Sequence, residues 1–329
     1  MVDFILSDMV NAGIRDVGVI MHGKCQSMMD HLRSGKSWDL SRSFGGLTLL
    51  PVFAYNSARG NGRFRGKLEA LDVVKDYLRH IRQDYVLLAD SDVALNIDLK
   101  AVLESHIKAG ADITVVCAPS TGDGLYLNLD ETGRVMEAVE EQRQGLRCLQ
   151  IFLLRTELLL SLVERFVSRH EYSFQGCVLQ GLTKELHIRG YAFHGFAAHI
   201  TDVAGYYASS MRLLDPAVRQ DLFCPDRPIY AKENDAASTY MDPQGGCVNS
   251  LVDDGCDIQG TVKNCILFRG VRIEPGADVE GCILFKGTVV RRGAVLRGVI
   301  TDKYVTVQEG RTLMGHENYP LVVARGVTI

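Results

Sequence analysis

Two aspartates one residue apart, Asp90 and Asp92, directly follow an apolar run and are the side chains best placed for chemistry in this sequence. The run, YVLLA at residues 85–89, carries no charge, which is typical of a central parallel strand buried on both faces. In open α/β sheets, ligands bind beyond the carboxyl ends of such strands. Carboxylates there are costly unless they hold a cation, accept hydrogen bonds or face water. Because Mg²⁺ takes carboxylate oxygens and shares them with substrate phosphates, phosphate chemistry is one interpretation.

A purely structural interpretation fits the same residues. Asp98 precedes a segment, residues 99–109, that has the apolar spacing of a helix. The acidic stretch would then only end a strand and cap the next helix, since aspartate is a favoured N-cap residue. Asp-x-Asp is too short a motif to decide between the two by spacing alone, so both interpretations stay open.

Basic residues gather in a second place, around a stretch rich in Gly and Asn at residues 56–62; they are Arg59, Arg63, Arg65 and Lys67. Gly and Asn permit positive φ angles, so the stretch is predicted to be a loop. Arginine side chains match the geometry of phosphate, so the cluster could bind an anion. A solvated basic loop is the simpler interpretation.

The elements that must position these residues alternate between helix and strand. Helices are predicted at residues 4–11, 26–33, 68–81, 99–109, 157–167 and 203–214, and strands at residues 14–20, 47–54, 85–89, 113–117, 125–129, 134–139, 149–154 and 191–200. This alternation predicts a mainly parallel sheet with helices on both faces. The alternation of helices and strands ends at residues 223–240, a polar tract that contains prolines. We therefore expect an α/β domain at residues 1–222, a linker at 223–240 and a second domain at 241–329.

The second domain is predicted from a repeat. Apolar residues recur in steps of six at Val271, Ala277, Ile283, Val289 and Val295. The block CILFRG at residues 265–270 returns as CILFKG at residues 282–287, close to three hexads further along the chain. A hexad repeat indicates one short strand and one tight turn on each face of a triangular coil, and such coils must stack to bury their faces. A left-handed parallel β-helix is therefore predicted.

Composition narrows the class of protein. The chain has 329 residues, 47% hydrophobic and 23% charged, as in ordinary globular proteins. A net charge of -4 argues against a nucleic-acid partner, and no apolar run approaches the roughly 20 residues of a membrane span. No signal peptide is visible, and the nine cysteines include no CxxC pair. Small buried thiols in a reducing cytoplasm are the expectation.

Several segments resemble the bacterial glucose-1-phosphate adenylyltransferase (ADP-glucose pyrophosphorylase) family. Residues 3–7 look like the start of its first helix, and residues 88–92 match its Gly-Asp strand end, with Asp92 on the metal-binding aspartate. Residues 201–205 match its W-x-D-V-G-T segment, with Asp202 on the second metal aspartate. The resemblance implies a Rossmann-like nucleotidyltransferase domain before the β-helix. It also implies a reaction in which ATP and glucose 1-phosphate give ADP-glucose and pyrophosphate for glycogen synthesis, with Mg²⁺ bridging the phosphates.

The departures from the family pattern concern phosphate and sugar contacts. The family's Gly-rich phosphate loop is absent, and its G-T-A-[DN]-A stretch is GKLEA here, beginning at Gly66. The family's F-x-E-K-P aligns with Glu140 and Glu141, so a phosphate-binding lysine becomes Glu141. Its D-F-G segment aligns with residues 173–176, which lack the acid. Gly66 and Glu140 are the remaining substrate-binding candidates.

These departures imply the family's non-catalytic, regulatory-type subunit, N-terminally truncated, and weak or absent catalysis. The implied partners are a catalytic adenylyltransferase subunit or a second copy, with a sugar phosphate or nucleotide as a possible effector. Two alternatives remain. Asp92 and Asp202 would serve an active sugar-phosphate nucleotidyltransferase. A β-helix can also carry acyltransferase chemistry, for which His316 is the nearest candidate base, although a surface turn suits that residue better.

Overall fold

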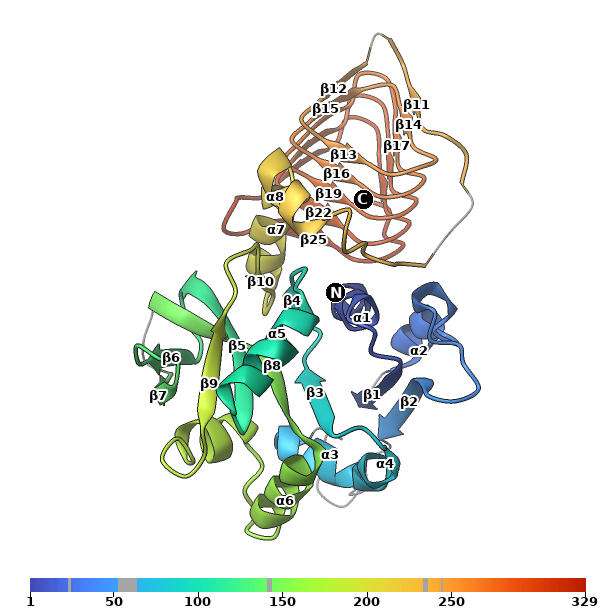
Figure 1. The fold of residues 1–329 in the computed structure, drawn as a ribbon. Coiled ribbons are helices and arrows are strands. Elements are labelled where there is room, and N and C mark those ends of the chain that lie inside the picture. Colours follow the sequence, from blue (N-terminus) through green and yellow to red (C-terminus); the bar gives the residue numbers. More distant parts are fainter. Residues whose placement is uncertain (23–24, 53–63, 141–143, 233–235, 244) are drawn as a thin grey trace. The chain divides into compact units, whose positions relative to one another are not determined.

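The structure, a computed structural model, describes residues 1–22, 25–52, 64–140, 144–232, 236–243 and 245–329. The chain forms two compact units (Figure 1). The first unit contains Met1–Ala197 and Pro225–Lys232, and the second contains Ala198–Cys224 and Glu233–Ile329. Among the described residues, no helix is both long and apolar enough to cross a membrane. Each unit is described by itself.

The first unit begins with a helix and two parallel strands. The elements are α1 (Val2–Asn11), β1 (Asp16–His22), α2 (Gln26–Leu32), the 3-10 helix η1 (Lys36–Trp38) and β2 (Gly46–Val52). The two strands form a sheet of their own, with Asp16 opposite Gly46. Helix α1 buries one apolar face, including Ile5 and Leu6, in a core that also contains Trp38. The apolar spacing read from the sequence therefore predicted this region correctly.

Most of the remaining strands of this unit form a second, six-stranded sheet with the order β7-β6-β8-β5-β9, in which β3 also pairs with β8. The strands are β3 (Tyr85–Ala89), β5 (Ile113–Thr121), β6 (Tyr126–Leu129), β7 (Val135–Val139), β8 (Gln144–Arg155) and β9 (Ile188–Ala192). The α/β class is confirmed, but this sheet is not mainly parallel. Among its described strands only β5 and β9 pair in parallel, because the long strand β8 runs antiparallel to β3, β5 and β6.

The position of strand β3 also differs from the prediction. The uncharged sequence predicted a central parallel strand buried on both faces. In the structure β3 pairs with β8 alone among the described strands, the pairing is antiparallel, and all five residues are partly exposed. The apolar pattern identified the strand but not its place, because the number of neighbours depends on distant segments.

Helices cover both faces of this sheet. They are α3 (Lys67–Val73), α4 (Lys75–His80), α5 (Leu99–Ala109) and α6 (Thr156–Val167). Adjacent residues of β5 enter different cores: Val115 packs in the core that includes Leu68 and Leu159, and Val116 packs in the core that includes Leu6 and Val102. The single helix predicted at residues 68–81 is two helices, interrupted at Val74.

In its described residues, the second unit contains two helices and the predicted parallel β-helix (Figure 1). The helices are α7 (Val203–Arg212) and α8 (Pro216–Leu222). The coil strands form three five-stranded sheets, β11-β14-β17-β20-β23, β12-β15-β18-β21-β24 and β13-β16-β19-β22-β25. They are β11 (Tyr240–Met241), β12 (Gly246–Val248), β13 (Leu251–Val252), β14 (Asp257–Ile258), β15 (Thr261–Lys263), β16 (Ile266–Leu267), β17 (Arg272–Ile273), β18 (Asp278–Glu280), β19 (Ile283–Leu284), β20 (Val289–Val290), β21 (Val295–Arg297), β22 (Val299–Thr301), β23 (Thr306–Val307), β24 (Thr312–Met314) and β25 (Leu321–Val323).

The register of the coils follows the sequence repeat. Ile266 pairs with Ile283, and Ile283 pairs with Ile300, so these two steps along the face both equal the spacing between the two CILF blocks. Side chains such as Val279 and Leu284 point into the coil and are 0% exposed. The sequence repeat therefore fixes both the register and the core of this region.

Helix α7 packs on the β-helix within the second unit. The Tyr207 hydroxyl donates a hydrogen bond to the Gly281 carbonyl oxygen at 2.6 Å, and Leu214 lies in one apolar cluster with Ile283. The domain bounds drawn from the sequence placed residues 198–222 with the α/β part, whereas the compact unit groups them with the coils. Helix α8 was not predicted, although Asp215 caps it and Pro216 is its first residue, a recognised start signal.

Candidate functional site

An ion pair occupies the carboxyl end of β3 in the first unit. Lys67, the first residue of α3, places its Nζ 3.0 Å from Asp90 Oδ2 and 3.4 Å from Gln150 Oε1. The same ammonium group lies 4.8 Å from the centre of the Phe152 ring, a cation–π distance. The lysine side chain is only 21% exposed. The Lys67 ammonium group, which lies where phosphate binding was predicted, is thus already paired with the Asp90 carboxylate.

Gln150 has an unusual backbone. Its φ is 60°, in the left-handed region that side chains other than Gly, Asn and Asp rarely adopt, although it lies inside β8. The pairing between β5 and β8 is irregular nearby, where the register shifts between Val115 and Cys117. Bulges of this kind re-aim side chains, and here the Gln150 amide points at Lys67. No residue pattern in the sequence indicated this position.

A second basic residue at this edge is also paired with an acid. Arg65 donates to Glu69 Oε1 through Nε at 3.0 Å and through Nη2 at 2.7 Å, and its backbone N–H donates to Glu69 Oε2 at 2.6 Å. These hydrogen bonds lower the pKa of Glu69. The guanidinium also stacks 3.7 Å from the centre of the Tyr172 ring. Arg65, just before α3, is therefore held against the first turn of that helix, and Arg59 and Arg63 lie outside the described residues.

The aspartates that follow β3 differ in their roles. Asp98 is the N-cap of α5, and its Oδ1 accepts hydrogen bonds from the backbone N–H groups of Lys100 and Ala101. The structural interpretation of the acidic stretch therefore holds for Asp98. Asp90 instead pairs with Lys67, and Asp92 is half-buried at the start of β4 (Val93–Ala94).

Asp202, the second predicted metal ligand, belongs to the second unit. It is the N-cap of α7, and its Oδ1 accepts a hydrogen bond from the Gly205 N–H at 2.6 Å. Capping explains an aspartate at this position without a metal. Within the described ranges, no three His, Cys, Asp or Glu side chains gather closely enough to hold an ion.

Packing explains Gly66, one of the two substrate-binding candidates. A Cβ atom at this residue would lie 2.1 Å from the Tyr172 carbonyl oxygen, so only glycine fits beside that backbone. The same carbonyl accepts a hydrogen bond from the Leu68 N–H at 3.1 Å. Glu140, the other candidate, is exposed just after β7, and Glu141 lies outside the described residues.

Several other reactive side chains are inert or remote. Burial raises the pKa of Cys117 to about 12 and that of Cys148 to about 11, so neither thiol is a nucleophile near neutral pH. His316 is exposed in a turn of the second unit, and its Nδ1 accepts a hydrogen bond from the Asn318 N–H at 3.3 Å. A neutral imidazole has one acceptor nitrogen, and this contact engages it, whereas a general base needs that lone pair free.

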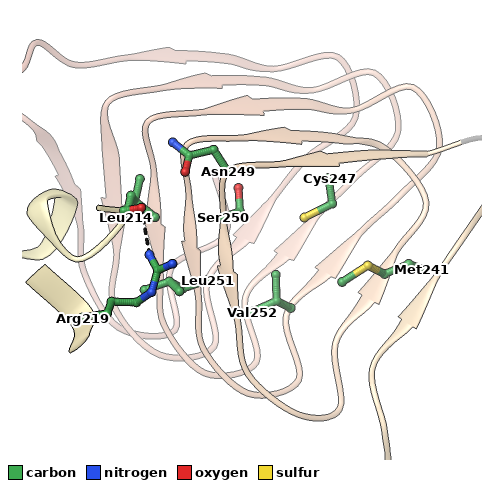
Figure 2. A pocket seen from close by; sticks show the side chains of 8 residues that line it. All are labelled: Leu214, Arg219, Met241, Cys247, Asn249, Ser250, Leu251 and Val252. Carbon is green, nitrogen blue, oxygen red and sulfur yellow. Dashed lines mark hydrogen bonds between the residues drawn. The ribbon is translucent and has the colours of Figure 1, made fainter. Parts of the chain in front are cut away.

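A hollow of about 440 Å³ lies at the first coil of the β-helix (Figure 2). Its lining includes Met241, Leu251, Val252 and the side chain of Arg219. The guanidinium Nη1 donates to the carbonyl oxygens of Leu213 and Leu214 at 2.7 and 2.8 Å. The arginine therefore closes the end of α7. The Cys247 thiol also lines the hollow, but burial raises its pKa, which makes it a poor nucleophile near neutral pH.

Comparison with known families assigns both parts of the chain. A family described as "Nucleotidyl transferase" matches residues 1–140, and one described as "GlmU-like, C-terminal hexapeptide" matches residues 236–319. The predicted fold class, a nucleotidyltransferase domain followed by a left-handed hexapeptide β-helix, is confirmed.

Individual relatives extend over most of the chain. The "Glycogen biosynthesis protein GlgD" of Bacillus subtilis (strain 168) is 33% identical over 281 residues, which are 85% of this chain and 73% of the relative. The protein of the same name in Geobacillus stearothermophilus is 36% identical over the same shares. A "Glucose-1-phosphate adenylyltransferase" of Geobacillus stearothermophilus is 29% identical over 289 residues, 85% of this chain and 74% of the relative.

Proposed function

Since this chain belongs to the family of GlgD proteins and bacterial glucose-1-phosphate adenylyltransferases, we propose that it serves glycogen synthesis as a regulatory-type subunit with little or no catalysis of its own. The proposed partner is a catalytic adenylyltransferase subunit. Geobacillus stearothermophilus holds both a GlgD protein and an adenylyltransferase similar to this chain, so the two forms occur together in one organism. We also propose a cytoplasmic location, where nucleotide sugars are made.

The ion pair between Lys67 and Asp90 is the main observation that supports weak or absent catalysis. A phosphate that approached Lys67 would meet the carboxylate 3.0 Å from the ammonium group. Two unit charges 4 Å apart interact by about 4 kcal/mol at an effective dielectric of about 20, and solvent reduces that figure at this partly exposed pair. Arg65 is similarly engaged with Glu69. Lys67 and Arg65 are thus both neutralised by carboxylates, and this arrangement does not favour phosphate binding at this edge.

Magnesium chemistry receives little support from the described residues. Nucleotidyltransferases of this family commonly use Mg²⁺, and Asp92 and Asp202 are the carboxylates that we propose for it. However, no cluster of ligands gathers in the described part of the chain, and Asp202 Oδ1 already accepts from Gly205. These residues do not make a resident metal site by themselves, so we derive no catalytic step through the ion.

An active sugar-phosphate nucleotidyltransferase is the second candidate function, and the half-buried Asp92 at the carboxyl end of β3 is the observation that favours it. An acyltransferase is not supported, because His316 lies in an exposed turn with Nδ1 engaged. A sugar phosphate or a nucleotide remains the proposed class of effector.

The test is a pyrophosphate-release assay with ATP, glucose 1-phosphate and Mg²⁺. The purified chain is assayed alone, the catalytic subunit of the same organism alone, and then the two together. We expect no release above background from the chain alone, a stable complex on size-exclusion chromatography, and altered kinetics of the catalytic subunit. Robust turnover by the chain alone, or no complex and unchanged kinetics, would contradict the proposal.

A further inference from the structure

Two cysteines of the β-helix are stacked neighbours inside the coil. Cys265 and Cys282 each stand one residue before a paired position, since Ile266 pairs with Ile283 on the neighbouring coil. Both cysteine side chains are 0% exposed and belong to the apolar cluster that fills the coil. Because neighbouring coils are one strand spacing apart, about 4.8 Å, the two thiols lie close together in the interior.

A repeated hydrogen-bond pattern links these cysteines to the coils on either side. Ser250 Oγ accepts a hydrogen bond from the Cys265 N–H at 3.0 Å. In the same way, Cys265 Sγ accepts from the Cys282 N–H at 3.4 Å, and Cys282 Sγ accepts from the Val299 N–H at 3.4 Å. We call these four stacked residues the thiol column. Each sulfur atom in it has a backbone donor, which favours the thiolate, the form of cysteine that binds metal ions.

The two thiols also interact with each other. The side-chain hydrogen bond from Cys282 and the Cys282 N–H lower the pKa of Cys265, whereas burial raises the pKa of Cys282. Cys265 is therefore the thiol that loses its proton more easily. The other facing pair, Cys117 on β5 and Cys148 on β8, differs, because burial raises both of those pKa values.

The ligands in the thiol column select the kind of metal ion. Thiolates are soft ligands, which copper(I) prefers. Metal–thiolate bonds are about 2.3 Å long, so a linear S–metal–S unit spans about 4.6 Å, close to the spacing of two coils. Zinc prefers four ligands, and in the part of the chain that the structure describes, no three His, Cys, Asp or Glu side chains gather closely enough to supply them.

The hollow at the first coil leads to the thiol column. Ser250, the first member of the column, lines this hollow together with Met241 and Cys247. Figure 2 shows the sulfur-containing side chains of Met241 and Cys247 at the first coil. Thioether and thiol sulfur are both soft ligands for copper(I). Soft side chains therefore lie at the hollow, and Cys265 lies directly behind Ser250 on the next coil.

We propose that Cys265 and Cys282 form a two-coordinate site for copper(I), in which the ion lies between two coils and replaces the protons of both thiols. Binding forms two S–Cu bonds and releases two protons, with no change in oxidation state. The bound unit carries one negative charge, which the N–H groups of Cys282 and Val299 stabilise as donors to its two sulfur atoms. The site does not depend on the function proposed above, because both cysteines lie in the β-helix.

The test measures the transfer of copper(I) to the full, reduced chain from its complex with the chelator bathocuproine disulfonate, without oxygen. The absorbance of the chelator complex gives the amount transferred, and X-ray absorption identifies the ligands. We expect one tightly held ion per chain, with two sulfur ligands in a linear arrangement. The chain is loaded both in its folded form and during refolding from denaturant, so a buried site that fills slowly is also measured.

Three serine variants locate the site. Cys265→Ser and Cys282→Ser each remove one ligand and should lower the affinity about a hundredfold or more. Serine suits the thiol column, because Ser250 already occupies it one coil earlier. The matched control is Cys256→Ser, which changes a 2% exposed thiol in the same apolar cluster and should leave the affinity unchanged. The Cys256 thiol donates to the Phe268 carbonyl oxygen, and a serine hydroxyl can do the same.

Several results would overturn the copper(I) site. They are no transfer from the chelator by either loading route, coordination by three or four sulfur atoms, or an affinity that survives both Cys265→Ser and Cys282→Ser. An equal loss of affinity in Cys256→Ser would also overturn it, because that loss would come from general damage to the core. The transfer and X-ray measurements need no variant, so they stand even if a serine variant unfolds.

Discussion

The two units of this chain differ in how many of their strand edges are paired with a neighbouring strand. In the β-helix, each inner strand pairs with the strand one coil before and with the strand one coil after, as Ile283 pairs with both Ile266 and Ile300. In the first unit, β1 and β3 each have one described partner and face a shared groove. A core made of local repeats is thus complete within a short stretch of sequence, whereas the sheet of the first unit depends on segments far apart in the chain.

Truncation of one leucine in each unit should have the largest effect and tests this comparison most directly. Leu284→Ala removes a side chain that is 0% exposed inside the coil and should destabilise the second unit by about 3 kcal/mol. Leu88→Ala, on the partly exposed β3, should cost less than half as much, because the groove already admits water. Denaturant unfolding monitored by hydrogen exchange separates the two units; equal losses would show that β3 is as well packed as the coil.

A pH titration should affect the first unit alone. Burial raises the pKa of Asp8 to about 8, although its Oδ1 accepts a hydrogen bond from the Ile97 N–H at 3.2 Å. The folded state therefore binds a proton that the unfolded state, with a pKa near 4, releases. The contribution of this group to stability is complete below about pH 4 and is lost as the pH rises toward 8.

The matched variant for that titration is Asp8→Asn, which keeps the acceptor and removes the charge. It should flatten the pH dependence of the first unit between pH 5 and 8 and stabilise it at pH 8 by up to about 5 kcal/mol, since about four pKa units separate the folded and unfolded carboxyl. The melting temperature measured at several pH values checks this result. An unchanged profile in the variant would assign the pH dependence to another group.

The ion pair at the end of β3 should respond to a neutral replacement. Asp90→Asn frees Lys67 from its carboxylate and should raise the affinity for pyrophosphate about tenfold, or about 1.4 kcal/mol. Isothermal titration measures this affinity. The double variant with Lys67→Gln should lose the gain; if it keeps the gain, pyrophosphate binds elsewhere.

The smallest change in stability is expected from the loss of an ion pair on the surface of the coils. Arg291 Nη1 lies 2.7 Å from Glu274 Oε1, and both side chains are partly exposed. Glu274→Gln should change the stability of the second unit by about 0.5 kcal/mol or less, because exposed ion pairs are screened by solvent and salt. A loss above about 1 kcal/mol in chemical denaturation would show that the coils depend on surface charge as well as on their core.

The sequence predicted the elements with local signals and missed those that depend on distant contacts. The repeated CILF block set the register at Ile283, and the apolar spacing predicted α5 at Leu99–Ala109 with its actual bounds. The place of β3 at a sheet edge was not predictable from its own five residues. Neither was the pairing of Lys67 with Asp90, because it depends on how α3 meets the end of β3.

The candidate site was predicted in part, and for definable reasons. Asp90 and Asp92 were correctly placed at the end of a strand, because the apolar run marks that end. The positive φ of Gln150 left no trace in the sequence, since nothing about glutamine indicates a left-handed backbone. The close approach of Tyr172 to Gly66 likewise needs coordinates, although a glycine before a helix was a hint. The assignments of Asp92, Asp202, Glu140 and Gly66 to metal or substrate stay predictions.

The spacing of the coils also sets which changes in chain length the second unit tolerates. Most successive strands keep the spacing that separates Ile266 from Ile283, but the pairs Leu251 with Ile266 and Asp257 with Arg272 are closer in sequence. The shorter turn must lose its residues from a corner, because a shift inside a strand would turn its inward side chains outward. Insertions and deletions should therefore collect at corners among homologous genes. Duplication of one whole turn would lengthen the domain without disturbing the turns on either side.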